Sequence, residues 1–152
     1  MRRLGTWAAM LAIPLLAIPV CAYGSDDPAP NDQLINDLQQ KIETAGPREQ
    51  CFLYAELIHE MTEMSIQQYN AGNDTRANAL LRQVQRLTQK LHLTMADNDK
   101  RLKKAEILLR RTAFRLREMM HDSGYEDRRV LAETLAQVNQ ADQDAMLQVF
   151  KR

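Results

Sequence analysis

The chain has few of the residues that build sheets, disulfide frameworks or flexible loops. Aromatic residues make up 5% of its 152 residues, and it contains five glycines and five prolines. Gln, Leu, Ala, Arg and Glu are plentiful instead, and this composition favours helices over strands. The two cysteines are Cys21 and Cys51. If Cys21 leaves with an N-terminal segment, one thiol remains, and a disulfide framework within one mature chain is excluded.

Motifs of catalysis are also missing from the sequence. It contains no Ser-His-Asp grouping, phosphate-binding loop, dinucleotide fingerprint or zinc-ligand spacing. We therefore expect a protein that is not an enzyme and that needs no cofactor.

The first 24 residues have the pattern of a secretory signal peptide. A short basic start precedes an apolar run at residues 7–20, and small residues at Ala22 and Gly24 offer two cleavage sites. The run is too short for a comfortable membrane span and contains two prolines. We therefore predict an exported protein, periplasmic or secreted, with no transmembrane span in the mature chain.

Cys21 raises the question of a lipid anchor. Val20 is larger than the residue usually found before a lipidated cysteine, so we expect no anchor there. Residues 25–30 form a polar, proline-containing linker, and residues 31–152 are long enough for a single helical domain. Acidic residues dominate up to Thr75 and basic ones after it. Since an exported protein rarely meets nucleic acid, we expect no nucleic-acid partner.

Three breaks divide the domain into helices. Gly46-Pro47 ends a first helix that begins near Asn31, and Pro47 suits the first turn of a second helix. Gly72-Asn73-Asp74 ends the second helix, and this turn is so short that the helices before and after it must be antiparallel. Ser123-Gly124 is the third break, and a last helix covers residues 126–150. The sequence therefore predicts an all-α fold.

The stretch from Asp74 to Asp122 is the longest segment without glycine or proline. Its apolar residues recur every three or four positions, in a heptad pattern that passes through Asn98 as a buried polar member. We favour one long helix here, which gives an extended helical hairpin. The alternative is a break near Asp97 and a compact antiparallel bundle of four helices.

Several segments of the chain resemble a family of small exported helical proteins of environmental bacteria. The likeness lies in Cys51-Phe52-Leu53-Tyr54-Ala55-Glu56-Leu57, in Leu102-Lys103-Lys104-Ala105-Glu106-Ile107-Leu108 and in Gln148-Val149-Phe150. That family has no assigned activity, so the resemblance implies only export and a helical fold.

Two Glu-x-x-His pairs, Glu56 with His59 and Glu118 with His121, match a pattern used by di-iron helical bundles. Such bundles need both pairs to point inward. At about 100° per residue, both pairs here fall outside the apolar arcs of their helices. We therefore predict that they do not form a di-metal centre.

Charged rows and an apolar stripe are the candidate contact surfaces. An acidic row on the second helix consists of Glu56, Glu60 and Glu63, and a basic row on the third consists of Arg82, Arg86 and Lys90. Both rows point away from the seam between these two helices, and they are either solvated faces or a docking site. A second stripe at Ile107 and Phe114 would stay exposed on a continuous helix, which predicts a homodimer. The candidate interaction residues are Glu56, Glu60, Glu63, Arg82, Arg86, Lys90, Ile107 and Phe114.

Two further residues fall on apolar faces. Asp142 lies in the stripe of the last helix, so we predict that it contacts Lys103 or Arg110. Cys51 lies on the buried arc of the second helix, which favours a packed thiol over an intermolecular disulfide.

These features predict a structural or protein-interaction module of the cell envelope, with a protein as partner. The alternative is a periplasmic stress-responsive helical chaperone or metal sensor, loosely similar to the exported Spy and CpxP proteins. Their Leu-Thr-x-x-Gln motif is not met here, because Leu87-Thr88 is followed by Gln89, Lys90 and Leu91.

Overall fold

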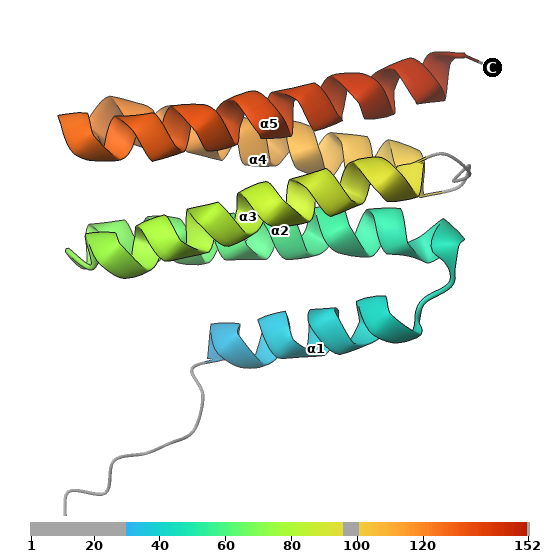
Figure 1. The fold of residues 1–152 in the computed structure, drawn as a ribbon, viewed down its shortest axis with the longest axis horizontal. Helices are drawn as coiled ribbons and strands as arrows, with labels where there is room; N and C mark the ends of the chain where they lie inside the picture. The colour runs from blue at the N-terminus through green and yellow to red at the C-terminus, as the bar shows by residue number, and fades with distance from the viewer. Residues whose placement is uncertain (1–29, 96–100, 152) are drawn as a thin grey trace, which may run out of the picture.

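The computed structural model describes residues 30–95 and 101–151, and within these ranges it contains helices and no strands. Figure 1 shows five helices: α1 (Pro30–Thr44), α2 (Pro47–Asn70), α3 (Asp74–Thr94), α4 (Leu102–Asp122) and α5 (Tyr125–Phe150). The all-α prediction is confirmed. The proposed signal peptide, the linker up to residue 29 and Asn98 lie outside the described residues.

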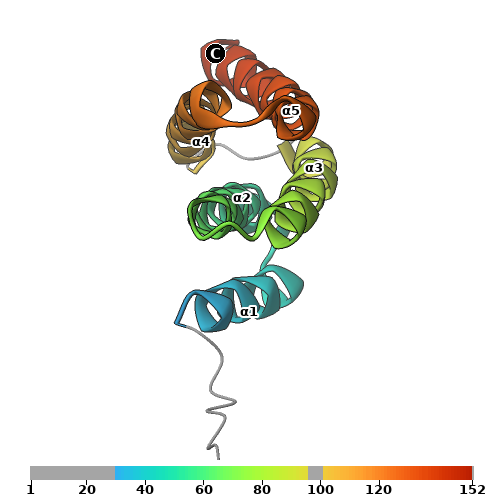
Figure 2. The same ribbon diagram turned by 90° about the vertical axis from the view of Figure 1, so that its left-hand side faces the viewer.

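Helices α2 to α5 form a four-helix bundle in which consecutive helices run antiparallel, whereas the packed pairs α2–α4 and α3–α5 run parallel (Figure 1). α2 packs against α3 and α4, and α5 packs against the same two helices, so the four lie at the corners of a square. α1 packs on α2, on the side of the bundle away from α4 and α5 (Figure 2). The outer side of the α4–α5 layer therefore has no helix of this chain upon it among the described residues.

The predicted breaks lie where the helices end. Gly46 is the N-cap of α2 and Pro47 its first residue, where the missing proline N–H costs no helical hydrogen bond. α2 ends at Asn70, and Gly72 two residues later has a φ of 75°, which suits a residue without a side chain. The N–H of Gly72 donates to the carbonyl of Tyr69, and that of Asn73 donates to Gln68. This paired arrangement satisfies the last carbonyls of α2.

The prediction of one long helix over residues 74–122 is wrong. α3 ends at Thr94, α4 begins at Leu102, and α4 returns along the bundle beside α2. The heptad pattern predicted the buried face on both sides of the break, because Leu91 and Leu109 are fully buried. The apolar face of each segment points to the core whether the chain reverses between α3 and α4 or continues as one helix. The compact-bundle alternative is therefore the observed architecture.

Candidate functional site

His59 lies in the interface between α2 and α4. Its Nδ1 is 3.0 Å from Oγ1 of Thr112, and its side chain is buried. The prediction that His59 faces outward is wrong, because α4 covers this side of α2. Burial lowers the pKa of His59, and the cations Arg111 and Arg115 lower it further, while Glu63 and Glu60 oppose the shift. The ring is therefore held in its neutral form.

The rest of the two Glu-x-x-His pairs does not converge. Glu56 is half-buried on α2, whereas Glu118 and His121 are exposed near the end of α4, where Arg115 binds Glu118 at 2.8 Å. Within the described ranges, no three His, Cys, Asp or Glu side chains are placed to share a metal ion. The absence of a di-metal centre stays a prediction that metal titration must test.

The acidic row on α2 is partly used inside the bundle. Nε and Nη2 of Arg115 on α4 donate to the two carboxylate oxygens of Glu63, at 2.8 and 3.0 Å. This two-point contact holds the pKa of Glu63 below its usual value, chiefly through the hydrogen bond. The sequence predicts that Glu63 points away from the seam with α3, and it did not predict this contact with α4. Glu56 and Glu60 beside it remain half-exposed.

The net charge of the helices alternates around the square. α3 and α4 carry more basic than acidic residues, whereas α2 and α5 carry more acidic than basic ones. Each of the four helix contacts in the bundle thus joins helices of opposite sign. Besides the pair formed by Glu63, His92 of α3 lies 3.1 Å from Asp144 of α5. The uneven charge along the sequence therefore supports the arrangement of the helices.

Asp142 contacts one of its two predicted partners. Its Oδ2 lies 3.9 Å from Nε of Arg110, which also binds Glu106 on its own helix. Burial raises the pKa of Asp142, Arg110 lowers it and Glu106 raises it again. Oδ1 of Asp142 is buried and has no hydrogen-bond partner among the described residues. The pair with Arg110 is confirmed, but it only partly satisfies the carboxylate.

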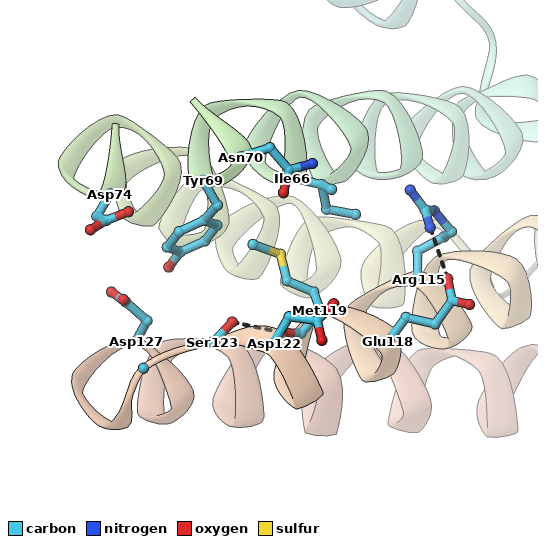
Figure 3. Close-up of a pocket in the computed structure, with 11 residues that line it drawn as sticks. Ile66, Tyr69, Asn70, Asp74, Arg115, Glu118, Met119, Asp122, Ser123 and Asp127 are labelled. Carbon is cyan, nitrogen blue, oxygen red and sulfur yellow. Dashed lines mark hydrogen bonds and ion pairs between the residues drawn. The ribbon is translucent and has the colours of Figure 1, made fainter. Parts of the chain in front are cut away.

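An open pocket of about 610 Å³ lies at one end of the bundle, where α2 and α4 end and α3 and α5 begin (Figure 3). Tyr69 lies among its carboxylates and donates a hydrogen bond to Asn78, which in turn donates to Asp127 at 2.9 Å. Asp74 and Asp127 are first-turn residues of their helices, where a carboxylate stabilises the helix dipole. The acidic groups thus have a structural role, and we assign no ligand to this pocket.

Cys51 is fully buried in the first turn of α2, as its place on the apolar arc predicted. Burial raises the pKa of its thiol to about 11, and a hydrogen bond with Thr94 only partly opposes this. A thiol with so high a pKa is a poor nucleophile at neutral pH. Cys51 is therefore a packing residue.

The outer side of α4 carries exposed apolar side chains bordered by cations. Ile107 and Phe114 are 55% and 53% exposed there and lie seven residues apart, which places them in line along the helix. At about 100° per residue, four cations lie within about 60° of this line. We call the surface formed by Lys103, Lys104, Ile107, Arg110, Arg111 and Phe114 the α4 outer face.

Ile107 and Phe114 are exposed as predicted, although that prediction assumed a continuous helix that the structure does not contain, and other exposed apolar residues were missed. Leu93 is 84% exposed at the end of α3, and Leu147 and Phe150 are exposed at the end of α5. All three lie off the apolar stripes of their helices, and that off-stripe position was the available signal. Arg82, Arg86 and Lys90 form the exposed basic row predicted on α3.

Among the described residues, no helix has the length and apolar character needed to cross a membrane. Comparison with known proteins gave no match to a family model, to a curated protein or to a solved structure.

Proposed function

We propose that the protein is an exported structural or interaction module of the cell envelope, which acts by docking rather than by catalysis. The observation that carries this proposal is the α4 outer face. Two large apolar side chains stay half-exposed there, whereas the apolar residues between the helices are buried. Apolar side chains grouped on a charged surface are typical of contact sites. The export part of the proposal rests on the signal-peptide pattern of residues 1–24.

The homodimer predicted from the sequence rested on two surfaces, the seam of a continuous helix and the stripe at Ile107 and Phe114. The seam is buried inside the bundle, since Leu91, Leu109 and Leu116 are fully buried. The α4 outer face is therefore what remains for self-association or for a different partner.

Photo-crosslinking in intact cells tests the docking proposal. Benzoylphenylalanine at position 114 places a reactive group on the α4 outer face. The matched control carries it at Gln143, an exposed position of α5. We expect light-dependent adducts with an envelope component from position 114 and none from position 143. Equal adducts from both positions, or none from position 114, would remove the proposal.

A chaperone is the second candidate, and the same surface favours it. Apolar side chains bordered by cations are also suited to holding unfolded clients. An aggregation assay with a model client, with and without zinc or copper, separates the two functions. Suppression at near-equal stoichiometry that is lost in Ile107→Ser/Phe114→Ser would favour the chaperone. No suppression leaves docking onto a folded or membrane component.

A further inference from the structure

The charges of the α4 outer face are largely unused by the fold. Within the described residues, the ion pairs of α4 involve Arg110 and Arg115, which bind carboxylates of α2, α4 and α5. Lys103, Lys104 and Arg111 are exposed and take part in none of these pairs. Three cations thus border the line of Ile107 and Phe114 without an ion-pair partner among the described residues, although Arg111 lies near enough to Glu63 of α2 to help lower the pKa of that carboxyl.

The order of residues along this face does not suit a partner helix. A helix-helix seam needs apolar residues at both of its alternating positions. Here Ile107 and Phe114 would occupy one set, and Arg110 would occupy the position between them. A partner helix would bury that guanidinium, which is costly unless its partner supplies a well-placed carboxylate.

A second copy of the chain suits the face no better. Two antiparallel α4 helices that bring Ile107 against Phe114 would also bring Arg110 of one copy against Arg111 of the other. Like charges placed opposite each other oppose association. The exposed stripe is therefore poorly suited to self-pairing.

A lipid surface accommodates the same order of residues. At a bilayer interface, an apolar side chain enters the acyl boundary while the stems of Lys and Arg extend to the phosphates. The face is also free for a flat surface, since α1 lies on the opposite side of the bundle (Figure 2). Glu118 and Asp122 mark the end of the cationic stretch, and Arg115 engages Glu118.

We propose that the α4 outer face binds the anionic surface of a lipid bilayer. Ile107 and Phe114 enter the headgroup region, and Lys103, Lys104 and Arg111 bind lipid phosphates. This inference rests on the proposed docking function and names the component onto which the face docks. It requires no membrane-spanning helix, because a peripheral helix lies in the plane of the interface.

Vesicle flotation tests the inference directly. The chain beginning at Ser25 contains all five helices and lacks the apolar run at residues 7–20, which would itself bind lipid. We expect it to float with vesicles of phosphatidylcholine mixed with phosphatidylglycerol and not with phosphatidylcholine alone. High salt should release it, because salt screens the attraction of the cations to the surface.

Two charge variants of equal net charge locate the surface. Lys103→Gln/Lys104→Gln/Arg111→Gln removes three cations from α4, and Arg82→Gln/Arg86→Gln/Lys90→Gln removes three from α3. Each cation near an anionic surface contributes roughly a fivefold change in affinity, so the α4 variant should bind about 100-fold more weakly. The α3 variant should bind as the parent does. Equal losses in both variants would show binding through overall charge and would overturn the inference.

A tryptophan reports entry of the face into the bilayer. The only tryptophan of the sequence is Trp7, which the chain from Ser25 lacks. Phe114→Trp should therefore show a blue-shifted emission with anionic vesicles, and Ala136→Trp on α5 should not. No vesicle binding, together with crosslinks from position 114 to a protein or to a second copy, would overturn the lipid inference and leave the docking function standing. If neither vesicle binding nor crosslinks from position 114 were observed, both the lipid inference and the docking function would be overturned.

Discussion

Nδ1 of His59 on α2 lies 3.0 Å from Oγ1 of Thr112 on α4. The two residues are 53 positions apart in the chain. Their contact requires α4 to run beside α2, and a helix that continued straight from Asp74 to Asp122 would carry Thr112 far from His59. The contact therefore depends on the reversal of the chain between α3 and α4, which brings α4 beside α2.

Acidification should weaken the fold through His59. Its pKa is lowered in the folded state and near 6.5 in the unfolded state, so the unfolded chain binds more protons between the two values. The free energy of unfolding is therefore expected to fall as the pH drops below about 6.5. Urea unfolding at two pH values, one on each side of this point, measures the effect.

Two histidine variants isolate this effect. His59→Gln should reduce the pH dependence, because Gln can bond to Thr112 without titrating. His121→Gln, at an exposed histidine on α4, should retain the full dependence. The same slope in His59→Gln as in the parent would mean that His59 is not the titrating group.

Loss of the Glu63–Arg115 contact should destabilise the bundle moderately. Both side chains are about one-third exposed, so we expect Glu63→Gln to cost about 0.5–1 kcal/mol. Glu118→Gln, which removes the more exposed partner of Arg115, should cost less. Because the pKa of Glu63 is lowered, its contribution is present above about pH 4.5 and lost as the pH falls through its folded pKa. Chemical denaturation of both variants at neutral and acid pH measures these differences.

Asp142→Asn should leave the fold as stable as the parent or more stable by up to about 1 kcal/mol, because burial disfavours the charged carboxylate. Arg110→Gln should instead destabilise, since it leaves Glu106 and Asp142 without their shared cation. Because the pKa of Asp142 is raised, the free-energy cost of burying its charged carboxylate disappears as the pH falls through the pKa of the folded state. A clear loss of stability in Asp142→Asn would show that the ion pair outweighs the burial.

Cys51 should react slowly with thiol reagents in the folded protein. Its thiol is fully buried and has a pKa of about 11, so both access and thiolate population are small at pH 8. Ellman's reagent should therefore modify it at the rate of unfolding, with rapid reaction after addition of urea. Rapid modification without denaturant would contradict the burial of Cys51.

The sequence was informative about helix ends and single faces, and much less so about the arrangement of helices. Gly46-Pro47 and Gly72 act locally, so their effects on the chain could be predicted. The reversal before Leu102 depends on the packing of α4 against α2 and α5, which a heptad pattern does not encode. His59 was missed for a similar reason, because α2 is covered by three helices and buries more than one face. The apolar residues around the whole of α2, such as Leu53 and Met64, were the signal for this.

The candidate surface was partly accessible to the same reasoning. Ile107 and Phe114 lie off the seam of their helix, and their exposure could be predicted in either architecture. The ion pair of Glu63 with Arg115 could not be predicted from the sequence, because it depends on which helix packs against α2 at the level of Glu63. The sequence could not separate Lys103, Lys104 and Arg111 from the cations of α4 that form ion pairs within the bundle, because the pairs of Arg110 and Arg115 depend on the packing of the helices.

Thiol labelling of position 114 in intact cells tests the docking of the α4 outer face most directly. Phe114→Cys and the α3 control Gln83→Cys are both exposed positions, and the buried Cys51 supplies a common background. We predict that the purified variants label equally fast with a membrane-impermeant maleimide, and that in the cell envelope Phe114→Cys is protected while Gln83→Cys is not. Equal labelling of both positions in the envelope would contradict docking through this face.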